Sequence, residues 1–367
     1  MEYNGFIYWA TQSRLHRIAI ANADEQWINA VPNWKTFDVT DTEFHPMAIQ
    51  QSATGPELFI GDGNQIAVVD TNGAFNSNAL DLTTPNRVKC MIDYELDILV
   101  GTFIDDSVTR AEIIRWDTVS TAWNVSDPVN EVGVNAFIRD DNILLVNAGR
   151  RGNIYYYDGE KLERFLPIPG DYSSTKTAYV HPGSVATFDG FPIFGFSNVS
   201  GNPTLQGIYS LGSYSRNYDK SLTLDWVISK NVTNEVEVGA IVVVNGLIYE
   251  AWKHGNDYGI DRLDTTAKYS GAYFTTKMLF REQRHLQKVH SETAAYYNSL
   301  PTGTGFAFSY STNAADFVSL TSVTNSLISE VRSRLAVPSV GSLQIKCAFT
   351  VSGNTAPTME RFKVMAE

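Results

Sequence analysis

Cysteine, long apolar runs and charged residues are all scarce in this chain of 367 residues. Two cysteines, Cys90 and Cys347, are too few for a disulfide framework or a thiolate metal site. No stretch approaches the roughly 18 consecutive apolar residues of a membrane span. The N-terminal sequence MEYNGFIYWATQSR lacks the basic and apolar regions of a signal peptide. Only 19% of the residues are charged and 43% are hydrophobic, which excludes a mainly disordered chain.

Basic residues are also fewer than acidic residues. The chain has 28 Lys and Arg residues against 40 Asp and Glu residues, a formal net charge of −12. This balance argues against duplex DNA or an anionic membrane surface as the main partner. At roughly 100 to 200 residues per domain, the length predicts two or three domains.

The sequence does contain a repeated unit, in which an apolar strand, a turn with Gly, Asn or Asp, and a second strand follow one another. The unit recurs over residues 1–270, and the positions taken as equivalent, spaced 40 to 55 residues apart, are Ile7, Leu58, Ile98, Leu144, Ile193 and Ile248. Alternation every second residue, with turn pairs such as Asn245-Gly246, excludes a helical solenoid. A period of this size built from short strands predicts a β-propeller of about six blades.

An additional apolar segment precedes each hairpin after the first. These segments are predicted to be the innermost strands of blades two to six, and they cover residues 47–50, 88–92, 134–138, 185–188 and 241–244. Only four residues precede the first hairpin, so blade one lacks such a segment. A later segment closes the ring, or a neighbouring chain does, or the ring is open.

Residues 271–367 have a different sequence pattern, in which longer alternating strands are separated by loops rich in Ser, Thr, Gly and Asn. About seven such strands predict a β-sandwich. This region carries a net charge of +3, which leaves −15 on residues 1–270 and favours head-to-tail contact between copies. The strand 305–312 has neither charge nor proline, so we expect it to be central in its sheet or paired with a partner. Cys90 and Cys347 lie in alternating strands and are predicted to be reduced and buried.

Residues that could carry chemistry are few. Four acids could serve a propeller glycosidase, which needs carboxylates converging over the channel: Asp93, Glu131, Asp189 and Glu250. However, Asp93, Asp140 and Asp189 follow inner strands at turns, where an acid usually caps the turn. The Ser-x-Asp-x-Gly-x-x-Trp turns typical of sialidase repeats do not occur in the sequence.

Metal and ligand sites are not predicted either. The six histidines have no metal-ligand spacing, and His285 and His290 would point to opposite faces of a strand. The acidic turns around Asp105 and Asp140 could hold Ca²⁺, but hairpin tips are generally rich in Asp. We therefore predict no catalytic, cofactor-binding or metal-binding residues.

Aromatic and basic residues are interpreted mainly as structural. In the run Tyr155-Tyr156-Tyr157 we expect one ring in the core and another to be accessible, where it could stack on a sugar. Packing in the core or between blades is the expected role of Trp9, Trp116 and Trp252. The basic clusters Arg150-Arg151 and 281–288 are expected to be solvated faces.

Several segments carry a resemblance to a known group of proteins. The blade opening NGFIYWATQSRLHRIAI, the turn YYYDGEKLERF and the closing LQIKCAFTVSGNTAPTMERFKV are similar to tailed-bacteriophage virion proteins. Those proteins pair a propeller with a sandwich and lie in the neck, hub, nozzle or tail tip. The resemblance implies a virion protein that is made in the host cytoplasm.

The leading hypothesis is therefore a non-enzymatic structural component of a virion, in the head-to-tail connector or tail. Its expected partners are portal, adaptor or tail proteins and copies of itself, with DNA passing through the assembly without specific binding. An alternative is a propeller that binds a glycan or a host receptor through exposed aromatic side chains. A glycoside hydrolase is the third hypothesis.

Overall fold

The structure is a computed structural model, and it describes residues 1–22, 30–39, 44–52, 55–105, 107–141, 143–166, 178–197, 206–212, 220–228, 236–264, 266, 272–276, 279–280, 290–312, 315–324, 330–337 and 342–366. These residues form antiparallel strands and one short 3₁₀ helix, η1 (Ile20–Asn22). In this part of the chain, no helix is both long and apolar enough to cross a membrane. The chain divides into two compact units, Met1–Leu263 and Asp264–Glu367.

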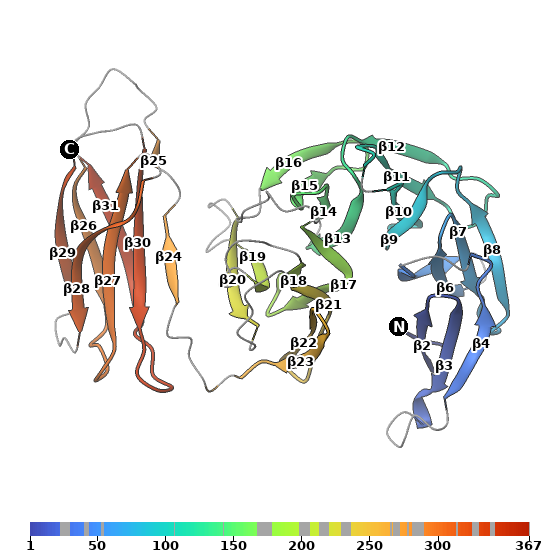
Figure 1. The fold of residues 1–367 in the computed structure, drawn as a ribbon, viewed down its shortest axis with the longest axis horizontal. Coiled ribbons are helices and arrows are strands. Elements are labelled where there is room, and N and C mark those ends of the chain that lie inside the picture. Colours follow the sequence, from blue (N-terminus) through green and yellow to red (C-terminus); the bar gives the residue numbers. More distant parts are fainter. Residues whose placement is uncertain are drawn as a thin grey trace. The chain divides into compact units, whose positions relative to one another are not determined.

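The first unit contains six antiparallel sheets, which we number in chain order (Figure 1). Sheets 1 to 5 each have four strands that pair in sequence order, and the described part of sheet 6 has three. The strands of sheets 1 to 3 are β1 (Glu2–Tyr3), β2 (Phe6–Thr11), β3 (Arg14–Ala19), β4 (Val31–Thr36), β5 (Met47–Ser52), β6 (Gly55–Asp62), β7 (Gln65–Val69), β8 (Phe75–Asp81), β9 (Arg87–Tyr94), β10 (Asp97–Phe103), β11 (Ala111–Trp116) and β12 (Val125–Val129). Those of sheets 4 to 6 are β13 (Val134–Asp140), β14 (Ile143–Ala148), β15 (Asn153–Tyr157), β16 (Leu162–Leu166), β17 (Tyr179–Phe188), β18 (Phe191–Ser197), β19 (Gly207–Gly212), β20 (Ser221–Val227), β21 (Glu237–Val244), β22 (Leu247–His254) and β23 (Asp257–Arg262).

This succession of sheets confirms the predicted all-β fold and its propeller. The five predicted inner segments are β5, β9, β13, β17 and β21, the first strands of sheets 2 to 6. Sheet 1 begins with β1, which has only two residues and pairs with β2. The inner strand of blade one is therefore present but very short.

Each sheet packs face to face on the next one. Because side chains alternate along a strand, Leu58 of β6 packs towards sheet 1 and Phe59 packs towards sheet 3. We call the face towards the next sheet the forward face and the opposite one the backward face. Five hydrophobic clusters join sheets 1 to 6 in order. Among the described residues, no cluster joins sheet 6 to sheet 1.

Glycines in the second strand of three sheets make this packing possible. Gly61, Gly101 and Gly195 lie on forward faces, and a Cβ atom on any of them would overlap a side chain of the next inner strand. The side chains that pack over these glycines are Val88, Val134 and Val238. The glycines therefore set how closely consecutive sheets approach each other.

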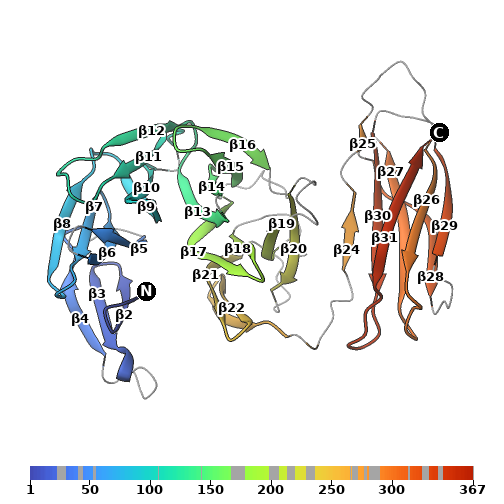
Figure 2. The same ribbon diagram turned by 180° about the vertical axis from the view of Figure 1, so that it is seen from behind.

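The second unit is a sandwich of two sheets (Figure 2). One sheet has the order β24-β30-β27-β28, with β25 also paired to β30, and the other has the order β29-β26-β31. The strands are β24 (Tyr273–Thr275), β25 (Leu279–Phe280), β26 (His290–Tyr297), β27 (Gly305–Thr312), β28 (Val318–Thr324), β29 (Glu330–Val337), β30 (Ser342–Thr350) and β31 (Met359–Ala366). Strand β27 lies between β30 and β28, which is the first of the two arrangements predicted for this uncharged strand.

Both cysteines are buried and free, as predicted. Cys90 lies between sheets 3 and 4, where burial raises the pKa of its thiol. Cys347 lies in the sandwich core among Phe306 and Phe308, and burial raises its pKa to about 12. Neither thiol has the lowered pKa of a reactive cysteine.

Candidate functional site

The four acids considered as glycosidase residues have separate surroundings. Asp93 forms an ion pair with Arg139 at 3.3 Å, and both side chains are about half exposed. Glu131 accepts a hydrogen bond from the Tyr155 hydroxyl. Glu250 is only 3% exposed and lies in β22, between Ile248 and Trp252 of the cluster that joins sheets 5 and 6. Among the four, only Asp189 lines an apolar and acidic pocket.

The predicted capping role of Asp140 is wrong, because this residue is 5% exposed and forms an ion pair with Lys220. By contrast, Asp105 does cap its own turn by accepting hydrogen bonds from the N–H and hydroxyl of Ser107. Within the described ranges, no group of three His, Cys, Asp or Glu residues could hold a metal ion. His285 lies outside the described residues, as do residues 281–288 in general, and of His290 only the backbone is described.

Of the three consecutive tyrosines, Tyr157 is buried, as expected for one ring, whereas Tyr155 and Tyr156 are half-buried. The Tyr157 hydroxyl donates to Asp127, and the Tyr156 ring packs 4.2 Å from the Phe165 ring. The Tyr155 and Tyr156 rings pack partly against the clusters that join sheet 4 to its two neighbouring sheets. Trp116 and Trp252 have the predicted packing role, with exposures of 1% and 8%.

The basic pair Arg150-Arg151 is exposed, as predicted, and it also lines a pocket of about 540 Å³. Glu131, Ser107 and Asn153 lie in the same pocket. Asn153 is buried and its side-chain oxygen accepts a hydrogen bond from Arg164. The pocket therefore combines both signs of charge with amide and hydroxyl groups.

A buried polar cluster ties the inner strands of sheets 3, 4 and 5 together. The Lys89 ammonium donates to Asn135 at 2.9 Å and lies 5.0 Å and 5.4 Å from the ring centroids of Phe103 and Tyr179. Burial, followed by the nearby Lys89 charge, lowers the pKa of His181 to about 4. His181 is therefore neutral at pH 7. The cluster holds a positive charge by amide and aromatic contacts within the chain.

The pocket that contains Asp189 lies at the turn end of sheet 5 and measures about 470 Å³. We call it the acid-aromatic pocket, and its lining residues are Phe188, Asp189, Phe191, Ile193, Ser210, Asp225 and Trp226. They come from the end of β17, the turn to β18, and the strands β18, β19 and β20. The pocket brings together two carboxyl groups, one hydroxyl group and three aromatic rings.

A tight turn positions Asp189. Asp189 and Gly190 have φ angles of 48° and 80°, and Phe188 pairs with Phe191 across them. Two positive φ angles define a type I′ hairpin turn, in which Asp and Gly are preferred. The local sequence thus explains the turn, and the turn presents the Asp189 side chain at the pocket.

A β-bulge positions Asp225. Ile208 pairs with Trp226 and Tyr209 pairs with Leu224, so Asp225 is the extra residue in β20. A bulge re-aims side chains and is common beside functional sites. Although the residue as a whole is exposed, neighbouring atoms crowd its carboxyl group, and this desolvation raises the pKa of Asp225 while Ser210 opposes the shift.

Aromatic rings form the apolar part of the same pocket. The rings of Phe188 and Trp226 meet edge to face, with centroids 5.7 Å apart. Phe191 is 45% exposed, and it covers Gly212, where a Cβ atom would approach its ring to 2.6 Å. An exposed ring supported by a glycine offers a flat apolar surface beside the two carboxyl groups.

Sequence reasoning found Asp189 and missed the rest of this pocket. Asp225 and Trp226 stand in an alternating segment that is typical of an outer strand, and nothing in it marks a bulge. The pairing with β19 is what places them beside Asp189.

No family model and no curated protein matches the chain. The solved structures with which it aligns include an exo-β-1,3-galactanase from Phanerochaete chrysosporium, with a TM-score of 0.36 and 10% identity over 89% of this chain and 96% of that one. They also include a glycoside hydrolase family 43 arabinoxylan arabinofuranohydrolase from Bacillus subtilis (TM-score 0.37, 8% identity, 99% and 95%). A sialidase from Trypanosoma rangeli aligns with a TM-score of 0.43 and 9% identity over 97% and 86%.

These comparisons correct the hypothesis of a bacteriophage virion protein in the connector or tail. The three structures described above are named as enzymes that act on sugars, and none of them is a virion protein. The prediction that the protein is not an enzyme is contradicted by the same finding. The physical reason is that short strands, hairpin turns and a terminal sandwich follow from the fold, which many functions share. The side chains of this chain have to carry the functional argument.

Proposed function

We propose that the protein binds a carbohydrate in the acid-aromatic pocket. The observation that carries the proposal is the convergence of Asp189, Asp225 and the exposed Phe191 ring on one pocket of about 470 Å³. A sugar ring has an apolar face of C–H groups and a rim of hydroxyl groups. Phe191 would stack on the C–H face, and the carboxylates and Ser210 would accept or donate hydrogen bonds at the rim.

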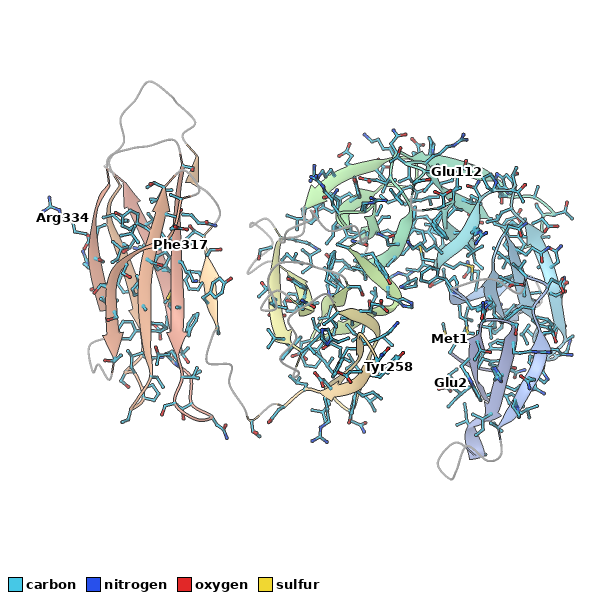
Figure 3. The ribbon with its side chains drawn as sticks, viewed as in Figure 1. Met1, Glu2, Glu112, Tyr258, Phe317 and Arg334 are labelled. Atoms are coloured by element: carbon cyan, nitrogen blue, oxygen red, sulfur yellow. The ribbon has the colours of Figure 1, made fainter. Side chains whose placement is uncertain are left out.

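A glycan array tests this proposal with two matched variants. Phe191→Ala removes the exposed ring from the pocket, and Phe317→Ala removes a ring that is 39% exposed in the second unit (Figure 3). We expect the wild-type protein and Phe317→Ala to bind the same saccharides, and Phe191→Ala to bind them about tenfold more weakly. Equal binding by all three proteins, or binding by none, contradicts the proposal.

Glycoside hydrolysis is a second candidate function, and the raised pKa of Asp225 favours it. A protonated Asp225 would donate its proton to the glycosidic oxygen as the bond to the sugar breaks. Asp189 would act as nucleophile, or as the base that activates water. Asp225 and Asp189 would thus take the two roles that glycosidases divide between a pair of carboxyl groups.

Hydrolysis is tested with the saccharides that the array identifies. Asp225→Asn should lower the rate about 100-fold or more, since it removes the acid while keeping the size of the side chain. Asp189→Asn should do the same, and asparagine also tolerates the positive φ of the turn. Binding without turnover in the wild-type protein would leave carbohydrate binding as the function and exclude hydrolysis.

A further inference from the structure

The forward face of sheet 6 is apolar and exposed. Val242 and Val244 of β21 are 52% and 45% exposed, and Ile260 of β23 is 75% exposed. A depression of about 330 Å³ on this face is lined by Ala240, Val242, Val244, Tyr249, Ala251 and Ile260. Tyr258 lies on the same face, since it pairs with Lys253 in the register that pairs Ile260 with Ala251, and it is 73% exposed (Figure 3). Contiguous exposed apolar side chains of this kind mark an interaction surface.

In sheets 1 to 5 the corresponding face is always covered. Leu99 of sheet 3, for example, packs with Leu144 and Val146 on the backward face of sheet 4. Tyr249 occupies the position in sheet 6 that Leu99 occupies in sheet 3, because each is the third residue after the two-residue turn of its hairpin. Sheet 6 therefore carries apolar side chains at the positions that pack against the next sheet elsewhere, although no sheet follows it.

Sheet 6 also has a small residue at the position over which the inner strand of a following sheet would pack. Gly101 and Gly195 lie at equivalent places after their turns, and Val134 and Val238 of the next sheets pack over them. Counted from its own turn, Ala251 occupies the same place in β22. It lies on the exposed face and lines the depression. The face is thus built to receive the backward face of another sheet.

We propose that the forward face of sheet 6 binds the backward face of sheet 1 in a second copy of this chain. Ile98 and Val100 lie on the backward face of sheet 3, where they pack against sheet 2. Counted from the hairpin turn, Ile7 and Trp9 occupy the same two positions in β2 of sheet 1. Sheet 1 is the sheet whose backward face packs against no other sheet in the described part of the chain.

This contact is heterologous, because a different surface of each copy takes part. Two copies joined in this way still have one free face each, so rings or longer assemblies follow if the concentration is high enough. The contact continues the sequence of sheet-on-sheet interfaces that already runs from sheet 1 to sheet 6. It does not depend on the proposed function.

Light scattering after size-exclusion chromatography gives the first test. The full chain should be larger than a monomer, and Val242→Glu should weaken the association about tenfold or more, because it buries a charge in an apolar contact. Val125→Glu is the matched control, since Val125 is 47% exposed on β12 of sheet 3. A monomeric wild-type protein at every concentration, or equal behaviour of the two variants, overturns the proposal.

Cross-linking identifies the two faces. A chain with Ile7→Cys is mixed with a chain with Val242→Cys and treated with a short bismaleimide, while the buried Cys90 and Cys347 stay unreactive. The proposal predicts a cross-link between the two different chains. If a chain that carries both substitutions instead forms an internal cross-link and remains a monomer, sheet 1 closes the ring within one chain and the proposal is wrong.

Discussion

Glu250 carries a carboxyl group in the packing layer between sheets 5 and 6. Burial, followed by the nearby charge of Asp261, raises its pKa to about 8. One of its carboxyl oxygens, Oε1, has no hydrogen-bond partner. At neutral pH the side chain is therefore mostly protonated, and ionisation would leave a charge among Ile248, Trp252 and other apolar side chains.

This environment predicts how stability depends on pH. The folded state holds the Glu250 proton more tightly than the unfolded chain does, so its contribution is fully present below about pH 4.5 and is lost as the pH rises to about 8. Glu250→Gln cannot ionise. Relative to the wild-type protein, it should gain on the order of 3 kcal/mol in the free energy of unfolding between about pH 5 and about pH 9, measured by urea denaturation.

An exposed residue supplies the control for this experiment. Glu163→Gln removes a carboxyl group that is 65% exposed in its surface pair with Lys161, and the difference between its stability and that of the wild-type protein should change little with pH. If Glu250→Gln shows the same small change, Glu250 is not desolvated in solution.

The buried pair of Asp140 and Lys220 joins sheet 4 to sheet 5. The Asp140 side chain is 6% exposed and that of Lys220 is 23% exposed, so solvent screens the pair only in part. Asp140→Ala should lower the free energy of unfolding by about 3 kcal/mol, because it leaves the Lys220 charge without its partner. Asp93→Ala breaks a half-exposed pair with Arg139 and should cost less than about 1 kcal/mol. Equal losses in chemical denaturation would contradict this ranking.

At the residue scale, the signals that sequence provides are local ones. Asp189 can be found because the pair Asp189-Gly190 marks a turn after an apolar strand. Asp225 cannot, since a bulge in β20 depends on pairing with β19. The ion pair of Asp140 gives no local sequence signal for a related reason, because Lys220, its partner, is 80 residues further along the chain.

At the scale of elements, the glycines beneath the inner strands β9, β13 and β21 limit the spacing of the sheets. A Cβ atom at Gly195 would overlap Val238, whereas at Gly239 of β21 nothing lies within 4 Å. Neither glycine has a positive φ angle. Gly195→Ala should therefore lower the free energy of unfolding by about 1 to 3 kcal/mol, and Gly239→Ala should change it by less than about 0.5 kcal/mol. Thermal unfolding of the two variants measures the difference, and a neutral Gly195→Ala would show that sheets 5 and 6 are less closely packed.

The elements themselves are largely predictable from the sequence. Inner strands such as β9 and β13 have apolar side chains on both faces, because each packs against two neighbouring sheets, and turn pairs delimit the hairpins. What sequence could not supply is the two-residue strand β1, which is too short to give a periodic signal. It is recognised only by its pairing with β2.

For the whole molecule, the two compact units should unfold separately. Clusters that join sheets 1 to 6 lie in the first unit, and the clusters around Cys347 and Leu335 lie in the second. Each unit holds one buried thiol, Cys90 or Cys347, which becomes reactive only when that unit unfolds. Thiol labelling in increasing denaturant, read by mass spectrometry, should give two midpoints and slow labelling of both thiols in the native protein. A single midpoint for both thiols would contradict independent units.

Function is the level at which sequence reasoning failed. The alternating pattern of the strands and the composition of the turns predict a propeller and a sandwich. These folds do not determine what a protein binds. The acid-aromatic pocket depends on one turn, one bulge and the exposed ring of Phe191. Those features become visible only when β17 to β20 are paired.

The most direct test of the carbohydrate proposal is a crystal structure of the protein with the saccharide that binds best on the array. We predict a sugar ring stacked on Phe191, with hydroxyl groups within hydrogen-bond distance of Asp189 and Asp225. A saccharide bound elsewhere on the chain, with the acid-aromatic pocket filled only by solvent, would contradict the proposal.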